Sequence, residues 1–139
     1  MTALDTGNTA WLTMSAILVM LMTVPGLAFF YGGLVRSKNI LSIVMQCLMC
    51  TAVISILWVA FGYSWVFGTG FQGTGIGAVI GGFDKLFLHG VTIHSIMSPS
   101  GVPEITFCLF QCMFAVITPG LIIGAFAERL KFSSFMVFS

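Results

Sequence analysis

Phenylalanine side chains recur at three- and four-residue steps in one apolar segment of the chain. The residues of this stripe are Phe107, Phe110, Phe114, Ile117 and Leu121. Steps of three and four place side chains along one face of an α-helix. A ring face attracts a cation by about 2 kcal/mol or more once water is removed, and stacked rings can exclude bulk water. The stripe therefore predicts either a cation path lined by rings or, more commonly for such a pattern, packing between membrane helices.

A second apolar segment holds Leu27, Phe30 and Tyr31, which share a helical face by the same spacing. On spacing alone we interpret these three residues as helix packing together with a tyrosine near the membrane surface.

The sequence offers few residues that could support metal binding or catalysis. Two cysteine pairs, Cys47-x-x-Cys50 and Cys108-x-x-x-Cys112, have spacings that can resemble a zinc site. Both pairs lie in apolar segments, where thiolates are costly and cysteine is a normal small packing residue. No nucleophile, acid/base pair or metal set occurs at a credible spacing, so we expect no enzyme, no metal site and no cofactor.

The composition requires a membrane. Hydrophobic residues make up 58% of the 139-residue chain and charged residues only 6%, against roughly a quarter charged in an ordinary soluble domain. A soluble fold of this size could not bury so much apolar surface. We therefore predict an all-α integral membrane protein.

Long uncharged stretches give the expected helices. A membrane-spanning helix needs about 20 apolar residues, and we predict spans at about 9–31, 40–67 and 103–127, with a fourth beginning at about 132. Asn8 or Thr9 is expected to cap the first span, the pair Gly32-Gly33 to close it, and Pro25-Gly26 to bend it. The stretch 68–102 is rich in glycine, which is typical of turns and loops.

Basic residues indicate the orientation. Arg36 and Lys38 follow the first span, and Arg129 and Lys131 follow the third. The N-terminus and the glycine-rich loop together contain a single Lys or Arg, which is Lys85. Cytoplasmic loops carry an excess of Lys and Arg. We therefore expect the N-terminus and the loop 68–102 to face outward.

Three blocks carry a family resemblance: GLAFFYGGLVRSKN, LWVAFGYSWVFG and FQCMFAVITPGLIIGAFAERLKF. Their combination of small, aromatic and charged residues strongly resembles the ammonium transporter (Amt/Mep/Rh) family, in the right order and over nearly all of the chain. The resemblance implies a multi-helix bundle, with homotrimers of eleven-helix protomers in the cell membrane, an outward N-terminus and a narrow pore in each protomer.

The same resemblance implies site residues. By the F-Q-x-x-F pattern, Phe110 matches the aromatic cage that recruits ammonium and Phe114 matches the outer ring of a phenylalanine gate. Leu27, Phe30, Tyr31 and Leu121 match pore-lining positions. Family members are often shut by a cytoplasmic PII signalling protein, which makes PII a possible partner here.

The chain departs from the family in length. It offers three spans and the start of a fourth, and the matching cage tryptophan, second gate ring, aspartate and pore histidines are all expected beyond Ser139. We therefore expect a fragment or one part of a split protein. An ammonium sensor coupled to a signalling module and a purely structural membrane subunit are alternatives to transport that the sequence leaves open.

Overall fold

The computed structural model describes residues 4–71, 75, 77, 79–98, 100–127, 129 and 131–138. These residues form two compact units, each of which is described by itself. The first unit comprises Met1–Met14 and Ile56–Cys112, and the second comprises Ser15–Ser55 and Met113–Ser139. Glu128 and Ser139, which entered the sequence analysis, lie outside the described residues.

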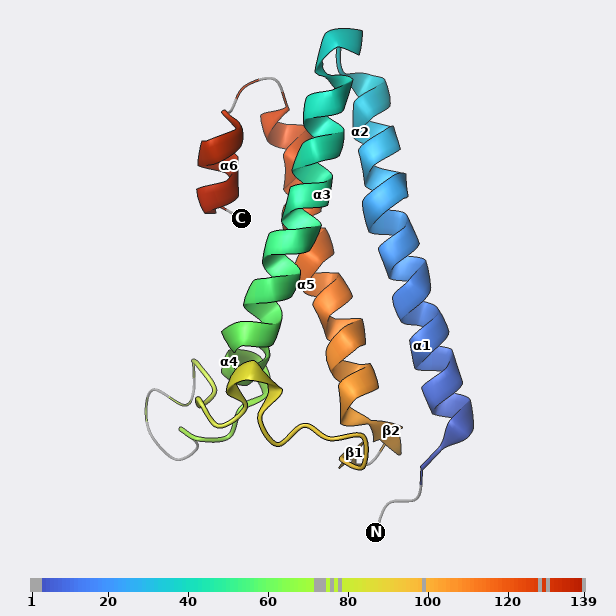
Figure 1. The fold of residues 1–139 in the computed structure, drawn as a ribbon, viewed down its shortest axis with the longest axis vertical. Helices are drawn as coiled ribbons and strands as arrows, with labels where there is room; N and C mark the ends of the chain where they lie inside the picture. The colour runs from blue at the N-terminus through green and yellow to red at the C-terminus, as the bar shows by residue number, and fades with distance from the viewer. Residues whose placement is uncertain are drawn as a thin grey trace. The chain divides into compact units, whose positions relative to one another are not determined.

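Three long helical stretches dominate the structure (Figure 1). The first contains α1 (Thr6–Leu21), the π-helical segment η1 (Met22–Leu27) and α2 (Ala28–Leu34). The second contains the 3-10 segment η2 (Ser37–Asn39), α3 (Ile40–Leu57), the π-helical segment η3 (Trp58–Gly62) and α4 (Tyr63–Phe67). The third is α5 (Glu104–Phe126), and the short helix α6 (Phe132–Phe138) follows it.

Each of the three stretches is long and apolar enough to cross a membrane. Helices are favoured there because they satisfy every backbone polar group internally. The all-α membrane fold class predicted from the sequence is therefore confirmed.

Both ends of the first helix differ from the prediction. Asp5 caps the helix, since its Oδ1 accepts a hydrogen bond from the backbone N–H of Asn8 at 3.0 Å. The expected caps, Asn8 and Thr9, already lie within α1. At the other end the helix continues through Gly32-Gly33 to Leu34, because glycine pairs are tolerated in apolar helices.

Two π-helical segments interrupt the first two stretches. Pro25 lies within η1, where the sequence predicted a bend; proline lacks the N–H that a regular turn needs, and the wider turn accommodates the ring. The segment η3 ends at Gly62, and the N–H of Tyr63 bonds to the carbonyl of Trp58. Pro119, in contrast, lies inside the continuous helix α5.

The second unit has a small apolar core built from four helices. Its buried members are Ala28 of α2, Ile43, Cys47 and Cys50 of α3, Ile123 of α5 and Phe135 of α6. The core therefore fixes α6 against α3 and α5 through Phe135, which is 1% exposed.

The first unit contains most of the glycine-rich connection between α4 and α5. Within it, the 3-10 turn η5 (Leu86–Leu88) is followed by two short strands, β1 (Ile96–Met97) and β2 (Val102–Pro103). The strands pair antiparallel, with Ile96 opposite Pro103 and Met97 opposite Val102. Strands of two residues give no periodic signal in a sequence, so this pair was not predicted.

Four glycines of this connection allow backbone segments to touch. A Cβ on Gly82 would lie 2.4 Å from both the Cα and the N of Gly70, and one on Gly68 would lie 2.3 Å from the carbonyl oxygen of Ser64. A Cβ on Gly81 would lie 2.7 Å from the carbonyl oxygen of Trp65 and 2.8 Å from that of Ser64. This contact has no space for any side chain, so it requires glycine.

Asp84 completes the glycine contact. Its carboxylate accepts hydrogen bonds from the backbone N–H groups of Thr69 at 3.1 Å and Gly70 at 3.3 Å. Partial desolvation on its own would raise the pKa of Asp84, but the hydrogen bonds from Thr69 and Gly70 outweigh it and hold the pKa below its ordinary value. The charged form of Asp84 is therefore the form that closes the loop.

This pKa predicts how the loop responds to acid. Because the pKa of the folded state is lowered, the stabilisation by Asp84 is complete above the unfolded value of about 3.9 and is lost as the pH falls through the folded value. We expect the amides of Thr69 and Gly70 to lose hydrogen-exchange protection on acidification, after correction for intrinsic rates. In Asp84→Asn this pH dependence should be absent; an unchanged profile would contradict the role of the carboxylate.

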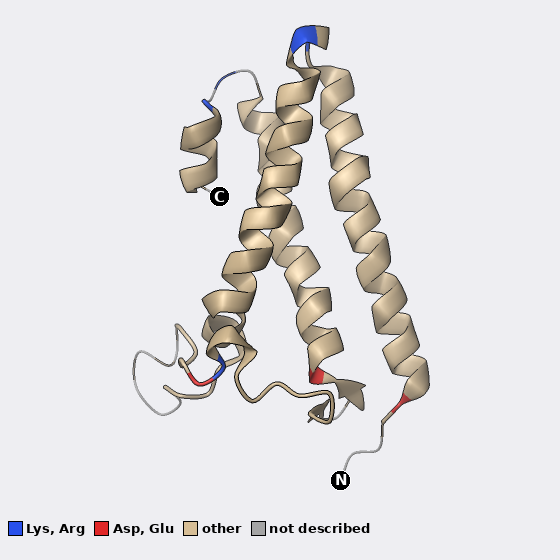
Figure 2. Cartoon of the chain, in the orientation of Figure 1, with Lys and Arg blue, Asp and Glu red and all other residues tan. Residues whose placement is uncertain are grey.

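The two units differ in the charged residues that they contain, and Figure 2 colours the basic and acidic residues. The described charged residues of the second unit are all basic, namely Arg36, Lys38, Arg129 and Lys131. Those of the first unit are Asp5, Asp84, Lys85 and Glu104. Among the described residues, every charge lies at a helix end or in a connecting segment.

Candidate functional site

A buried polar cluster joins the start of α5 to the end of the second helical stretch. Glu104, which is 7% exposed, accepts a hydrogen bond from the hydroxyl of Tyr63 at 2.9 Å and forms an ion pair with Lys85. The ammonium of Lys85 also lies 5.6 Å from the centre of the Tyr63 ring, within range of a cation–π contact. A carboxylate and a ring face therefore hold one ammonium group.

The neighbouring residue extends this cluster into the loop. Ser64, fully buried, donates a hydrogen bond to the carbonyl of Gly82 at 2.7 Å and accepts one from the N–H of Lys85 at 3.1 Å. The FGYS block of the sequence thus supplies two adjacent side chains that hold the loop. Sequence reasoning missed the cluster, because no spacing relates residues 63, 85 and 104; only the charges of Lys85 and Glu104 hinted at it.

Aromatic rings surround this cluster. The ring of Phe67 lies 5.2 Å from that of Tyr63 and 5.1 Å from that of Phe107, and Trp58 lies 6.2 Å from Tyr63. These edge-on and tilted contacts are typical of stable aromatic packing. In the first unit, Phe107 of the predicted stripe is therefore a packing residue.

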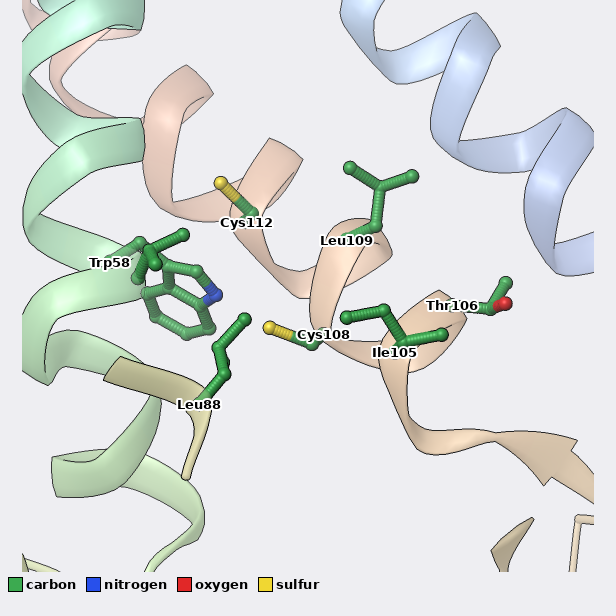
Figure 3. Close-up of a pocket in the computed structure, with 8 residues that line it drawn as sticks. Trp58, Leu88, Ile105, Thr106, Cys108, Leu109 and Cys112 are labelled. Atoms are coloured by element: carbon green, nitrogen blue, oxygen red, sulfur yellow. The ribbon is translucent and has the colours of Figure 1, made fainter. Parts of the chain in front are cut away.

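An apolar pocket of about 290 Å³ lies beside these rings (Figure 3). It is lined by Trp58, Val59, Leu88, Ile105, Thr106, Cys108, Leu109 and Cys112. The indole nitrogen of Trp58 is buried there and faces the thiol of Cys108, a weak hydrogen-bond acceptor. Neither Phe110 nor Phe114 lines this pocket.

The two rings with predicted transport roles lie one helical turn apart on α5. Phe110 is partly exposed, and Phe114 is 44% exposed. One turn further along α5, the hydroxyl of Thr118 donates a hydrogen bond to the backbone carbonyl of Phe114 at 2.8 Å. The roles of Phe110 and Phe114 remain predictions.

The four residues predicted to line a pore, Leu27, Phe30, Tyr31 and Leu121, all lie in the second unit. The hydroxyl of Tyr31 donates a hydrogen bond to the carbonyl of Leu121 at 2.9 Å, and a Cβ on Gly120 would lie 3.3 Å from Leu27. The Tyr31 ring packs so closely on Gly124 that a Cβ there would lie 2.4 Å from its Cε1. The ring of Phe30 contacts Tyr31 edge-on but is 61% exposed.

The four cysteines are buried and none of them forms a disulfide. Among the residues that the structure describes, no group of three or more His, Cys, Asp or Glu side chains could hold a metal ion.

The model of the Ammonium Transporter Family matches residues 10–139. The chain belongs to this family. The ammonium transporter of Bacillus subtilis is 44% identical over 133 residues, and the alignment covers 96% of this chain and 31% of that protein. Ammonium transporter 1 of Dictyostelium discoideum is 46% identical, with 95% of this chain and 27% of that protein covered.

Solved structures agree with this family assignment. Mep2 of Saccharomyces cerevisiae matches with a TM-score of 0.79 at 33% identity, covering 99% of this chain and 29% of that one. Mep2 of Candida albicans matches with a TM-score of 0.76 at 33% identity, covering 97% of this chain and 28% of that one. The ammonium transporter family consists of transport proteins and not enzymes, as expected. The chain spans about a third of the length of these relatives.

Proposed function

We propose that this chain forms part of a membrane pathway for ammonium and ammonia, with Phe110 as an outer cation-binding ring and Phe114 as a gate ring. The observation that carries the proposal is that a member of this family holds both rings one turn apart on α5. Between Glu104 and Phe126 that helix contains no charged residue. A cation on this helix therefore meets ring faces and no competing ion pair.

The chemistry of ammonium fits such a route. Ammonium resembles potassium in size and charge, so selectivity needs desolvation, ring faces and hydrogen-bond acceptors in addition to charge. A dry phenylalanine constriction penalises a hydrated ion far more than a neutral molecule. The gate would therefore favour the passage of ammonia, with the proton handled separately.

The remaining predicted residues complete the proposal. Leu27, Phe30, Tyr31 and Leu121 would line the route, and all four belong to the second unit. The basic residues Arg36, Lys38, Arg129 and Lys131 support a cytoplasmic location for the two connecting segments that hold them, with the N-terminus outside. We also propose a homotrimer in the cell membrane and a PII signalling protein as a cytoplasmic partner, as the family resemblance implies.

The test is uptake of methylammonium by transport-deficient cells. All 139 residues would replace the matching first third of the Bacillus subtilis ammonium transporter, and the half-saturation concentration would be measured. In Phe110→Ala we expect this concentration to rise by about tenfold or more, since a cation–ring contact contributes about 1 kcal/mol when exposed and about 2 kcal/mol or more when desolvated. Phe29→Ala is the matched control, because Phe29 is 75% exposed and has no assigned role.

The gate assignment is tested in the same cells. We expect Phe114→Ala to change the maximal uptake rate while the half-saturation concentration changes little, because a gate acts after recruitment. Unchanged uptake in Phe114→Ala would disprove the gate, and an unchanged half-saturation concentration in Phe110→Ala would disprove the cation site.

A further inference from the structure

The ion pair of Glu104 and Lys85 has no part in the proposed roles of Phe110 and Phe114. Glu104 is buried against Tyr63, and the side chain of Lys85 is 26% exposed. A buried ion pair is a poor device for stability, because well-packed apolar residues in its place are often equally stable or more so. Its presence at the start of α5 therefore calls for an explanation from its charge.

The position of the ion pair on α5 suggests what its charge does. Glu104 precedes Phe110 by six residues on α5, which corresponds to about 9 Å along the helix axis and about 120° around it, so about 9 Å is the shortest separation of the two sites. This separation is close to the screening length of about 8 Å at physiological salt. A net charge at Glu104 would therefore act on a cation held at Phe110, and Lys85 brings that charge to zero.

We propose that Lys85 neutralises Glu104 so that the cation site at Phe110 selects its ligand by ring contact and not by bare charge. An unpaired carboxylate would attract potassium and ammonium alike, so potassium would occupy the site and compete at lower concentrations. Lys85 and Glu104 thus set the affinity of the site for cations without touching the substrate. This inference rests on the proposed function, because it requires a cation at Phe110.

Charge-changing variants separate this role from a structural one. In the chimera described above, we expect Lys85→Met to lower the half-saturation concentration for methylammonium and to make potassium a stronger competitor. Glu104→Gln should raise the half-saturation concentration. A unit charge about 9 Å away or farther predicts shifts of up to about twentyfold, depending on the local dielectric constant.

The double variant Lys85→Met/Glu104→Gln should return both quantities to the wild-type values. It restores zero net charge without restoring the ion pair. Lys85→Arg should also behave as wild type. A merely structural pair predicts the opposite, namely that both single variants shift in one direction and that the double variant stays impaired.

Two results would overturn the proposal. One is a shift of the two single variants in the same direction, and the other is a double variant whose half-saturation concentration or potassium sensitivity differs from wild type. The double variant decides the matter even if the single variants do not reach the membrane. The assignment of Phe110 is tested separately. If it is wrong, the half-saturation concentration for methylammonium will be unchanged in Phe110→Ala.

Discussion

Gly82→Ala is expected to open the loop between α4 and α5. The new Cβ would lie 2.4 Å from the backbone of Gly70 and 2.8 Å from the Asp84 carboxylate. Backbone cannot move aside as a flexible side chain can, so we expect a cost of more than about 3 kcal/mol, at the upper end for overpacking. The hydrogen bond from Ser64 to the carbonyl of Gly82 would be lost with it.

Trypsin can measure this opening. Lys85 is the one trypsin site in the loop 68–102, and cleavage of a transiently opened segment follows the open population. In detergent micelles we expect the rate of cleavage at Lys85 to rise by about a hundredfold, which corresponds to roughly 3 kcal/mol. Gly75→Ala is the control, because no atom lies within 4 Å of its added Cβ. Equal rates in the two variants would show that the glycine contact does not hold the loop.

Gly124→Ala is expected to destabilise the second unit. Its Cβ would lie 2.4 Å from Cε1 and 2.9 Å from Cζ of Tyr31. The ring would have to rotate away and would lose its hydrogen bond to the carbonyl of Leu121. We expect a loss of about 2–4 kcal/mol from overpacking and from the hydrogen bond together.

Thermal unfolding followed by helical circular dichroism in detergent would measure this loss. Gly33→Ala is the matched control in α2, since its Cβ meets no atom within 4 Å and alanine favours the helix. Removing the Tyr31 ring in Gly124→Ala/Tyr31→Leu should cost less than the sum of the two single changes. Additive losses would show that Tyr31 and Gly124 do not share the contact.

The helices were predictable because lipid requires long apolar segments, and length and charge alone reveal these. The residue at which the first helix begins could not be predicted, because Asp5 and Asn8 are both good caps. Only the hydrogen bond from the N–H of Asn8 to Asp5 shows that Asp5 is the cap. The glycines of the loop were read as turn formers. Among the described residues, however, positive φ occurs only at Gly90, Gly101, Phe87 and Leu88. The glycines with the least space for a Cβ, such as Gly68 and Gly82, instead allow two backbone segments to touch.

The site was predictable only where residues are related by helical spacing or by family pattern. Phe110 and Phe114 share a helix, so their register follows from three- and four-residue steps. Tyr63, Lys85 and Glu104 come from three separate segments, and their meeting depends on how the loop folds. A pattern along one chain cannot show such a contact, since the side-chain types involved are ordinary in all three segments.

The π-helical segment η3 has a consequence for how Tyr63 and Ser64 are aimed. A π turn accommodates one residue more than an α turn, and one residue corresponds to about 100° of rotation in a regular helix. The extra residue between Trp58 and Gly62 therefore sets the angle at which the two side chains leave the helix. Deleting a single residue there would preserve the apolar length of the span and yet turn the tyrosine hydroxyl away from Glu104.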